Sequence, residues 1–157
     1  MRDWVAEWRQ EGRIFVWRYP KRSKHAGEWH FTGDPAGCRS LRNLFDRMAG
    51  GSAGHRTLQL GQVTPAISAV PNFGEPKTDR FASMRIVFRP DANDLVVEED
   101  GDRLILTFGN KRIRPLRAAF AEVEIGTGDF GIAPSDDRKA EAWWFWSMPW
   151  SAGFYKQ

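Results

Sequence analysis

The alternation of apolar and polar side chains along the chain predicts several β-strands. Residues 13–19 are rich in β-branched and aromatic side chains, and residues 28–32 alternate between apolar and polar positions, so the two segments predict a hairpin. Further strands are predicted at 57–63, 84–88, 95–98 and 103–108. The last two flank an Asp-Gly turn, which is typical of a tight hairpin.

Apolar residues at spacings of three and four predict two helices. The first follows Asp34, whose side chain suits the helix cap, with Pro35 at the first helical position and Gly50-Gly51 beyond the last turn. Its apolar face comprises Cys38, Leu41, Leu44, Phe45 and Met48. The second helix is predicted at 114–123, whereas three prolines between residues 64 and 78 predict a long loop.

Together these elements predict a single α+β domain that covers residues 1–157. Strands outnumber helices, which favours a largely antiparallel sheet of about six or seven strands with two or three helices packed mainly on one face. The sequence contains no internal repeat and no low-complexity linker that would divide it. A chain of 157 residues can bury a core without help from a metal or a disulfide.

The segment 142–150, AWWFWSMPW, holds four of the eight tryptophans. A strand with one face in water alternates between polar and apolar side chains. From Ala142 to Trp146, however, neither set of alternate positions is polar. We interpret this segment as a strand that is covered on both faces and ends before Pro149; the alternative is that one of its faces is an aromatic binding surface.

Composition and charge narrow the class of protein. The sequence is 41% hydrophobic, 13% aromatic and 27% charged, as expected for a folded globular protein. It has no apolar run long enough for a membrane span and does not begin with a secretory signal, so we expect a cytoplasmic protein without membrane association. The net charge of +3 is unevenly distributed, since residues 1–57 carry +5 and the remainder carries −2.

Motifs for catalysis or cofactor binding are weak. The pattern G-x-G-x-x-G occurs at 126–131, but Pro134 interrupts the helix that should follow and Asp129 would repel a phosphate, so we interpret it as a turn. The three histidines lack metal-site spacing, and Cys38 lies on the apolar face of a helix, where a thiol is inert. We expect no catalytic residue, metal or cofactor. A small enzyme whose active-site residues are distant in sequence stays open as an alternative.

Binding of a macromolecule, most simply another protein, is therefore the expected function. Tryptophan and tyrosine are typical anchors of protein interfaces, and several aromatic residues fall in the predicted loop and in the C-terminal tail. The predicted partner-binding residues are Phe73, Trp150, Phe154 and Tyr155. Trp4 and Trp8, four residues apart on a possible N-terminal helix, are further candidates. The oligomeric state does not follow from the sequence.

A single-stranded nucleic acid is the alternative partner. Cationic side chains can contact phosphates while bases stack on aromatic rings, and the first predicted hairpin combines both kinds of residue. The residues predicted for this role are Trp17, Arg18, Lys21, Arg22, Lys24 and Trp29. The other interpretation of the same hairpin is an exposed basic turn whose rings face the core.

Three segments carry a resemblance to known proteins. The run WHFTGDPAGCRSLRNLFDRM, followed by GTGDFGIAP and by the AWWFW strand, resembles an uncharacterised group of small bacterial cytosolic proteins, some of them immunity-protein-like. The order of these segments extends the resemblance over most of the chain. It implies a protein that binds another protein and performs no chemistry, and it implies no catalytic residues.

Overall fold

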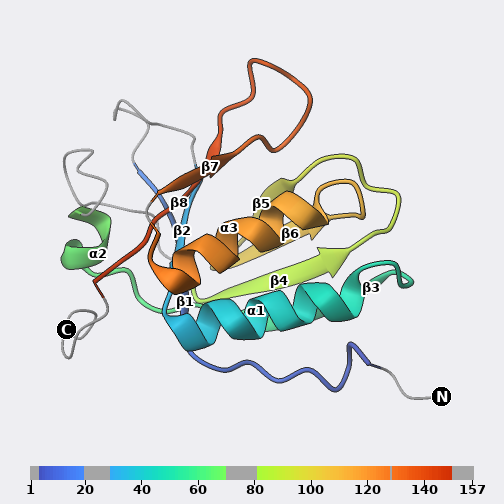
Figure 1. Cartoon of the computed structure of the whole chain (residues 1–157), viewed down its shortest axis with the longest axis horizontal. Coiled ribbons are helices and arrows are strands. Elements are labelled where there is room, and N and C mark those ends of the chain that lie inside the picture. The colour runs from blue at the N-terminus through green and yellow to red at the C-terminus, as the bar shows by residue number, and fades with distance from the viewer. Residues whose placement is uncertain (1–3, 20–28, 70–80, 128, 150–157) are drawn as a thin grey trace.

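A computed structural model of the chain describes residues 4–19, 29–69, 81–127 and 129–149. Within those ranges it contains three helices and eight strands (Figure 1). The elements run in the order β1 (Ile14–Arg18), β2 (Trp29–Gly33), α1 (Pro35–Met48), β3 (Gly54–Gln59), α2 (Pro65–Ala69), β4 (Ser83–Phe88), β5 (Val96–Asp100), β6 (Arg103–Phe108), α3 (Ile113–Ile125), β7 (Phe130–Ile132) and β8 (Trp143–Phe145).

The strands form two four-stranded sheets. The first has the order β1-β2-β8-β7 and the second the order β3-β4-β6-β5. Pairs β2–β8 and β4–β6 are parallel, and the other pairs are antiparallel. The α+β class is confirmed, but the prediction of one largely antiparallel sheet of six or seven strands is wrong. Both parallel pairs join strands that are not consecutive in the chain, so no local hairpin signal marks them.

The two sheets meet at the start of β1. Ile14 forms a parallel bridge to Leu60, and the backbone N–H of Gly61 donates to the carbonyl oxygen of Ile14 at 2.8 Å. This approach requires glycine at position 61, because a Cβ there would lie 2.3 Å from the ring of Phe15. One strand of the first sheet is thus bonded directly to the chain that leaves β3.

Helix α1 begins at the same junction. The Asp34 carboxylate accepts a hydrogen bond from the N–H of Gly37 at 2.7 Å, which confirms the predicted cap, and the same oxygen accepts from the N–H of Arg13 at 2.9 Å. Pro35 occupies the first position of the helix. Gly37 allows the backbone of Arg13 to pass close by, since a Cβ at this position would lie 2.2 Å from the Arg13 carbonyl oxygen.

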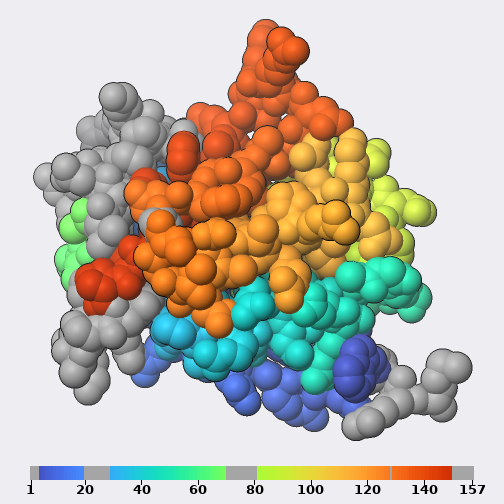
Figure 2. Space-filling model, in the orientation of Figure 1, coloured from blue at the N-terminus to red at the C-terminus, as the bar shows by residue number. Residues whose placement is uncertain are grey.

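Helices α1 and α3 lie side by side in front of the sheets, and their side chains form a continuous surface (Figures 1 and 2). The guanidinium of Arg42 bonds to Glu124, and that of Arg117 lies 2.6 Å from Asp46. Since residue numbers rise along one helix as they fall along the other, the helices are antiparallel. Their inner faces share one core with both sheets, in which Leu44, Phe45, Leu116, Phe120, Phe31, Phe145, Ile86, Leu106 and Phe108 are fully buried.

The tryptophan-rich strand is covered on both faces, as predicted. Trp143 and Phe145 of β8 belong to the main core, whereas Trp144 and Trp146 pack with a second core on the opposite side of the first sheet. This second core is built mainly from Phe15, Trp17, Tyr19, Ile67, Trp146 and Met148. The indole N–H of Trp146 donates to Nδ1 of the buried His30 at 2.9 Å. The aromatic run is therefore a structural layer.

Several predicted boundaries differ from the structure. Strand β3 begins at Gly54 and ends at Gln59, earlier than the predicted 57–63, because its inward positions include only one large apolar residue, Leu58. The predicted loop at 64–78 contains a short helix, α2, at its start, and residues 70–78 lie outside the described ranges. The N-terminal segment forms a turn at residues 4–7 instead of a helix.

Asp34→Ala tests the junction at the start of α1. The substitution removes the acceptor from two backbone N–H groups, and we expect the free energy of unfolding to fall by about 1–2 kcal/mol. Urea denaturation followed by circular dichroism measures the effect. Asp34→Asn keeps the side-chain oxygen and serves as the control, with a smaller expected loss. Equal stability of Asp34→Ala and the wild type would contradict this account of the junction.

Candidate functional site

Alternate side chains of the second sheet point away from the helices and form a separate surface. Cross-strand pairing arranges these side chains in three rows: Gln59-Ser83-Arg103-Asp100, Thr57-Arg85-Ile105-Glu98 and His55-Val87-Thr107-Val96. Arg89 continues the outward alternation of β4. We call these residues the outer face. All are partly or fully exposed, whereas the inward residues Met84, Ile86 and Leu106 are fully buried.

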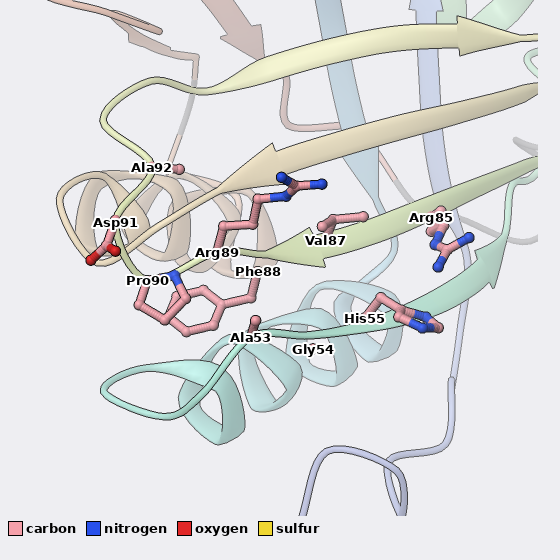
Figure 3. A pocket seen from close by; sticks show the side chains of 10 residues that line it. All are labelled: Ala53, Gly54, His55, Arg85, Val87, Phe88, Arg89, Pro90, Asp91 and Ala92. Carbon is pink, nitrogen blue, oxygen red and sulfur yellow. The ribbon is translucent and has the colours of Figure 1, made fainter.

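Two hollows lie on the outer face. One has a volume of about 640 Å³ and extends from His55 over β4 to the turn after it (Figure 3). The other, of about 500 Å³, extends over β6 and β5. Both are lined by Arg85, Val87 and Arg89, and Figure 3 shows these side chains in sequence along β4. The two hollows therefore flank a single line of residues, in which an apolar side chain of β4 separates a cation on the strand from a cation directly after it.

Arg85 differs from the other arginines that are partly buried. Its Nε is buried without a hydrogen-bond partner, as are the Nε atoms of Arg47 and Arg56. Arg47 and Arg56 each donate from another guanidinium nitrogen to a backbone carbonyl, at 3.0 Å in both cases. By contrast, the Arg85 guanidinium makes no hydrogen bond or ion pair with any residue in the described ranges. Its Nε is enclosed by the protein, and its terminal nitrogens likewise have no partner among the described residues.

The charges of the outer face are arranged from centre to rim. Arg85 lies on the central strand β4, Arg89 is the first residue after it, and Arg103 is held by Asp100 at 2.6 Å. The remaining carboxylates, Glu98 on the edge strand and Asp91 in the turn after β4, line one hollow each. The centre of the face is therefore cationic, and its carboxylates lie at the periphery.

Apolar side chains accompany these charges. Val87, Ile105 and Val96 project outward from three neighbouring strands, and Val96 is 40% exposed. Polar residues usually occupy the outward positions of a half-exposed strand, and these three β-branched side chains form an apolar area among them. Apolar groups beside an arginine are typical of the central part of a protein interface.

Cys38 is not a nucleophile in this fold. Its side chain is fully buried, and the thiol donates to the carbonyl oxygen of Gly33 at 3.5 Å. Burial raises the pKa of the thiol, and the charges of Glu124 and Asp34 raise it further. The interpretation of Cys38 as a buried apolar residue is confirmed.

The glycine motif forms a turn. Gly126 ends α3 in the left-handed conformation with φ of 71°, and Gly131 lies within β7. The motif thus connects a helix to a strand, whereas a dinucleotide fingerprint connects a strand to a helix. Among the residues that the structure describes, no cluster of three or more His, Cys, Asp and Glu side chains is placed to hold a metal ion.

The predicted partner-binding residues Phe73, Trp150, Phe154 and Tyr155 lie outside the described residues. The N-terminal candidates are described. Trp8 is buried and donates to the Ser40 carbonyl oxygen at 2.8 Å, and Trp4 is 53% exposed beneath the guanidinium of Arg47. Trp8 is therefore a core residue, and Trp4 is a partly exposed surface residue.

The described residues of the basic and aromatic hairpin have structural partners. Trp17 is fully buried in the second core, and Trp29 is 8% exposed and belongs to the main core. Arg18 lies 4.7 Å above the ring of Trp29 and 2.9 Å from a carboxylate oxygen of Glu99. The two rings thus pack on opposite faces of the first sheet. Lys21, Arg22 and Lys24 lie outside the described residues.

Sequence reasoning missed the outer face. A strand was predicted at 84–88, and its alternation already placed Arg85 and Val87 on one side, with Arg89 directly after it. The available signal was the valine between two arginines on a side expected to be polar. The order of the strands, which adds Ile105 and Val96 to this side, has no local signal in the sequence.

Comparisons of the chain with protein-family models, curated proteins and solved structures find no match. Of the helices in the described ranges, none is both long enough and apolar enough to span a membrane. Function is therefore inferred from the physical chemistry of the site.

The burial of Cys38 predicts slow reaction with thiol reagents. A disulfide reagent reacts with the thiolate and must contact it, so labelling of Cys38 requires opening of the fold. Each 1.4 kcal/mol of opening free energy lowers the labelling rate about tenfold. The absorbance of the released thiolate measures the rate. The same protein in guanidinium chloride is the control and should react at once. Rapid stoichiometric labelling of the native protein would refute the assignment.

Proposed function

We propose that the protein acts by binding another protein through the outer face of the second sheet, without performing chemistry. The unpartnered guanidinium of Arg85, set among outward apolar side chains, carries this proposal. The buried Nε without a partner costs free energy, and a charged acceptor on a bound protein that bonds the terminal nitrogens of the same guanidinium would offset part of that cost. Arginine is also among the residues most enriched at the energetic centres of protein interfaces.

The composition of the outer face favours a protein over a single-stranded nucleic acid. Its arginines would suit phosphates, but none of its residues is Phe, Tyr or Trp, and His55 is its one ring, so it has no row of rings on which successive bases could stack. Val87, Val96 and Ile105 provide an apolar surface that protein side chains can cover. The basic hairpin of residues 17–29 is the second candidate site for a nucleic acid, with Arg18 as its one described cation.

An immunity- or adaptor-like role is the form of this function that the resemblance of the three sequence segments implies. Such a protein acts by occupying a surface of its partner, which requires a rigid and exposed face. The outer face meets this requirement, because its strands are paired through continuous ladders and its inward side chains are anchored in the main core.

Differential capture tests the proposal. The tagged protein is incubated with nuclease-treated lysate of its source cells, and bound proteins are identified by mass spectrometry. We expect Arg85→Glu to lose a partner that the wild type retains, because the substitution reverses the charge at the centre of the face. Arg114→Glu, on the exposed side of α3, is the matched control and should retain that partner.

A second pair of variants separates lost binding from lost folding. Val96→Lys adds a charge at a side chain that is 40% exposed, and Ile125→Lys does the same at a side chain that is 68% exposed on α3. We expect loss of the partner only for Val96→Lys, with unchanged circular dichroism for both. Equal capture by all four variants, or partners that disappear from the wild type after nuclease treatment, would argue against the proposal.

A further inference from the structure

We infer that the outer face recognises an extended acidic segment of its protein partner, with carboxylates four residues apart and an apolar side chain midway between them. This inference rests on the proposed function and specifies the chemistry of the partner. It follows from the line of Arg85, Val87 and Arg89 along β4, which lines both hollows.

The spacing of the two arginines sets the spacing of the carboxylates. Arg85 lies in β4, and Arg89 directly follows the strand, where its backbone N–H still donates to the carbonyl oxygen of Phe108 at 2.9 Å. Over these four positions, a rise of about 3.3 Å per residue separates the two Cα atoms by about 13 Å. An extended segment that lies along β4 has the same rise, so its residues i and i+4 lie opposite the arginines. Its residue i+2 then lies opposite Val87.

The donors of Arg85 suit a carboxylate. A guanidinium can donate two parallel hydrogen bonds to a carboxylate, and a charged acceptor gives stronger hydrogen bonds than a neutral one. Within the described ranges, the arginines with good ion-pair geometry, such as Arg42, Arg112 and Arg117, already bond to carboxylates of this chain. Arg85 lacks such a partner there, and its position beside Ile105 and Val87 keeps water from part of the guanidinium.

The rim of the outer face disfavours a polyphosphate. Glu98 and Asp91 each line one of the two hollows, and a nucleic acid would bring phosphates close to both. An acidic segment brings only two carboxylates to the face, each opposite an arginine, and therefore meets less repulsion from Glu98 and Asp91 than a chain of phosphates would. The valine between the arginines also needs an apolar group to cover it, which a sugar-phosphate backbone does not supply.

Peptide binding tests the inference directly. The probe is a fluorescein-labelled peptide, Ser-Glu-Thr-Val-Thr-Glu-Ser, and the readout is fluorescence anisotropy at low salt together with backbone amide NMR shifts of the full chain. We expect the shifts to fall on β4 and β6. We expect Arg85→Gln and Arg89→Gln each to raise the Kd about tenfold, as loss of a charge-assisted hydrogen bond predicts, whereas Arg114→Gln leaves it unchanged.

Three further probes define the outcomes. A peptide with both Glu replaced by Gln should bind at least about tenfold more weakly, since it retains the shape but not the charge. Equal affinity of the two peptides, or absence of shifts on the outer face at millimolar peptide, overturns the inference. An eight-nucleotide oligothymidine that binds the same face as tightly overturns it in favour of phosphate recognition.

A peptide with the glutamates three residues apart should bind more weakly, and equal binding would refute the proposed spacing.

Failure of this inference and failure of the proposed function give different results. If Arg85→Glu and Val96→Lys lose a captured protein while the acidic peptide does not bind, the outer face is an interface for a partner of different chemistry. If the outer-face variants lose no protein and the peptide does not bind, both proposals fail.

Discussion

The hydrogen bonds of Asp34 and of the backbone at residues 13 and 14 hold together the parts of this fold. One oxygen of Asp34 accepts from Gly37 at the start of α1 and from Arg13 before β1, and the next carbonyl, that of Ile14, accepts from Gly61 after β3. A helix and both sheets are therefore aligned at two consecutive residues. Gly37 and Gly61 make this possible, because a Cβ at either position would lie within 2.3 Å of the neighbouring chain. The shared core beneath α1 and α3 depends on this alignment.

This arrangement leaves the two sheets with different surroundings. The first sheet is buried on both faces, since the helices cover one side and the second core, with Ile67 of α2, covers the other. The second sheet shares the helices but, in the part of the chain that the structure describes, has no helix or strand over its outer face. Aromatic residues accordingly gather in the first sheet, where they have a structural role. The arginines and valines of the second sheet lie on its outer face, which is the proposed binding surface.

Local signals in the sequence predicted the parts of the fold that local physics determines. The cap at Asp34, the Asp-Gly hairpin and the two-sided burial of β8 each follow from side chains close together in the chain. The insertion of β8 beside β2 and the parallel pairing of β4 with β6 do not, because these contacts join distant segments and alternation specifies only the face of each strand. The candidate site was missed for the same reason. Arg85 is an ordinary outward residue until the strand order places Ile105 beside it.

The position of Arg85 is difficult to explain from stability alone. Position 85 lies between Thr57 and Ile105 in its cross-strand row and needs only a side chain that tolerates a half-exposed strand. Threonine at this position would meet that need without burying a guanidinium nitrogen. Other arginines with a buried Nε, Arg47 and Arg56, recover part of the cost through bonds from a second nitrogen. Arg85 makes no such hydrogen bond to any described residue, so the cost of its buried Nε is not offset within that part of the chain. This uncompensated cost, in a sheet whose inward side is fully packed, is the observation on which the proposal of a protein partner for the outer face rests.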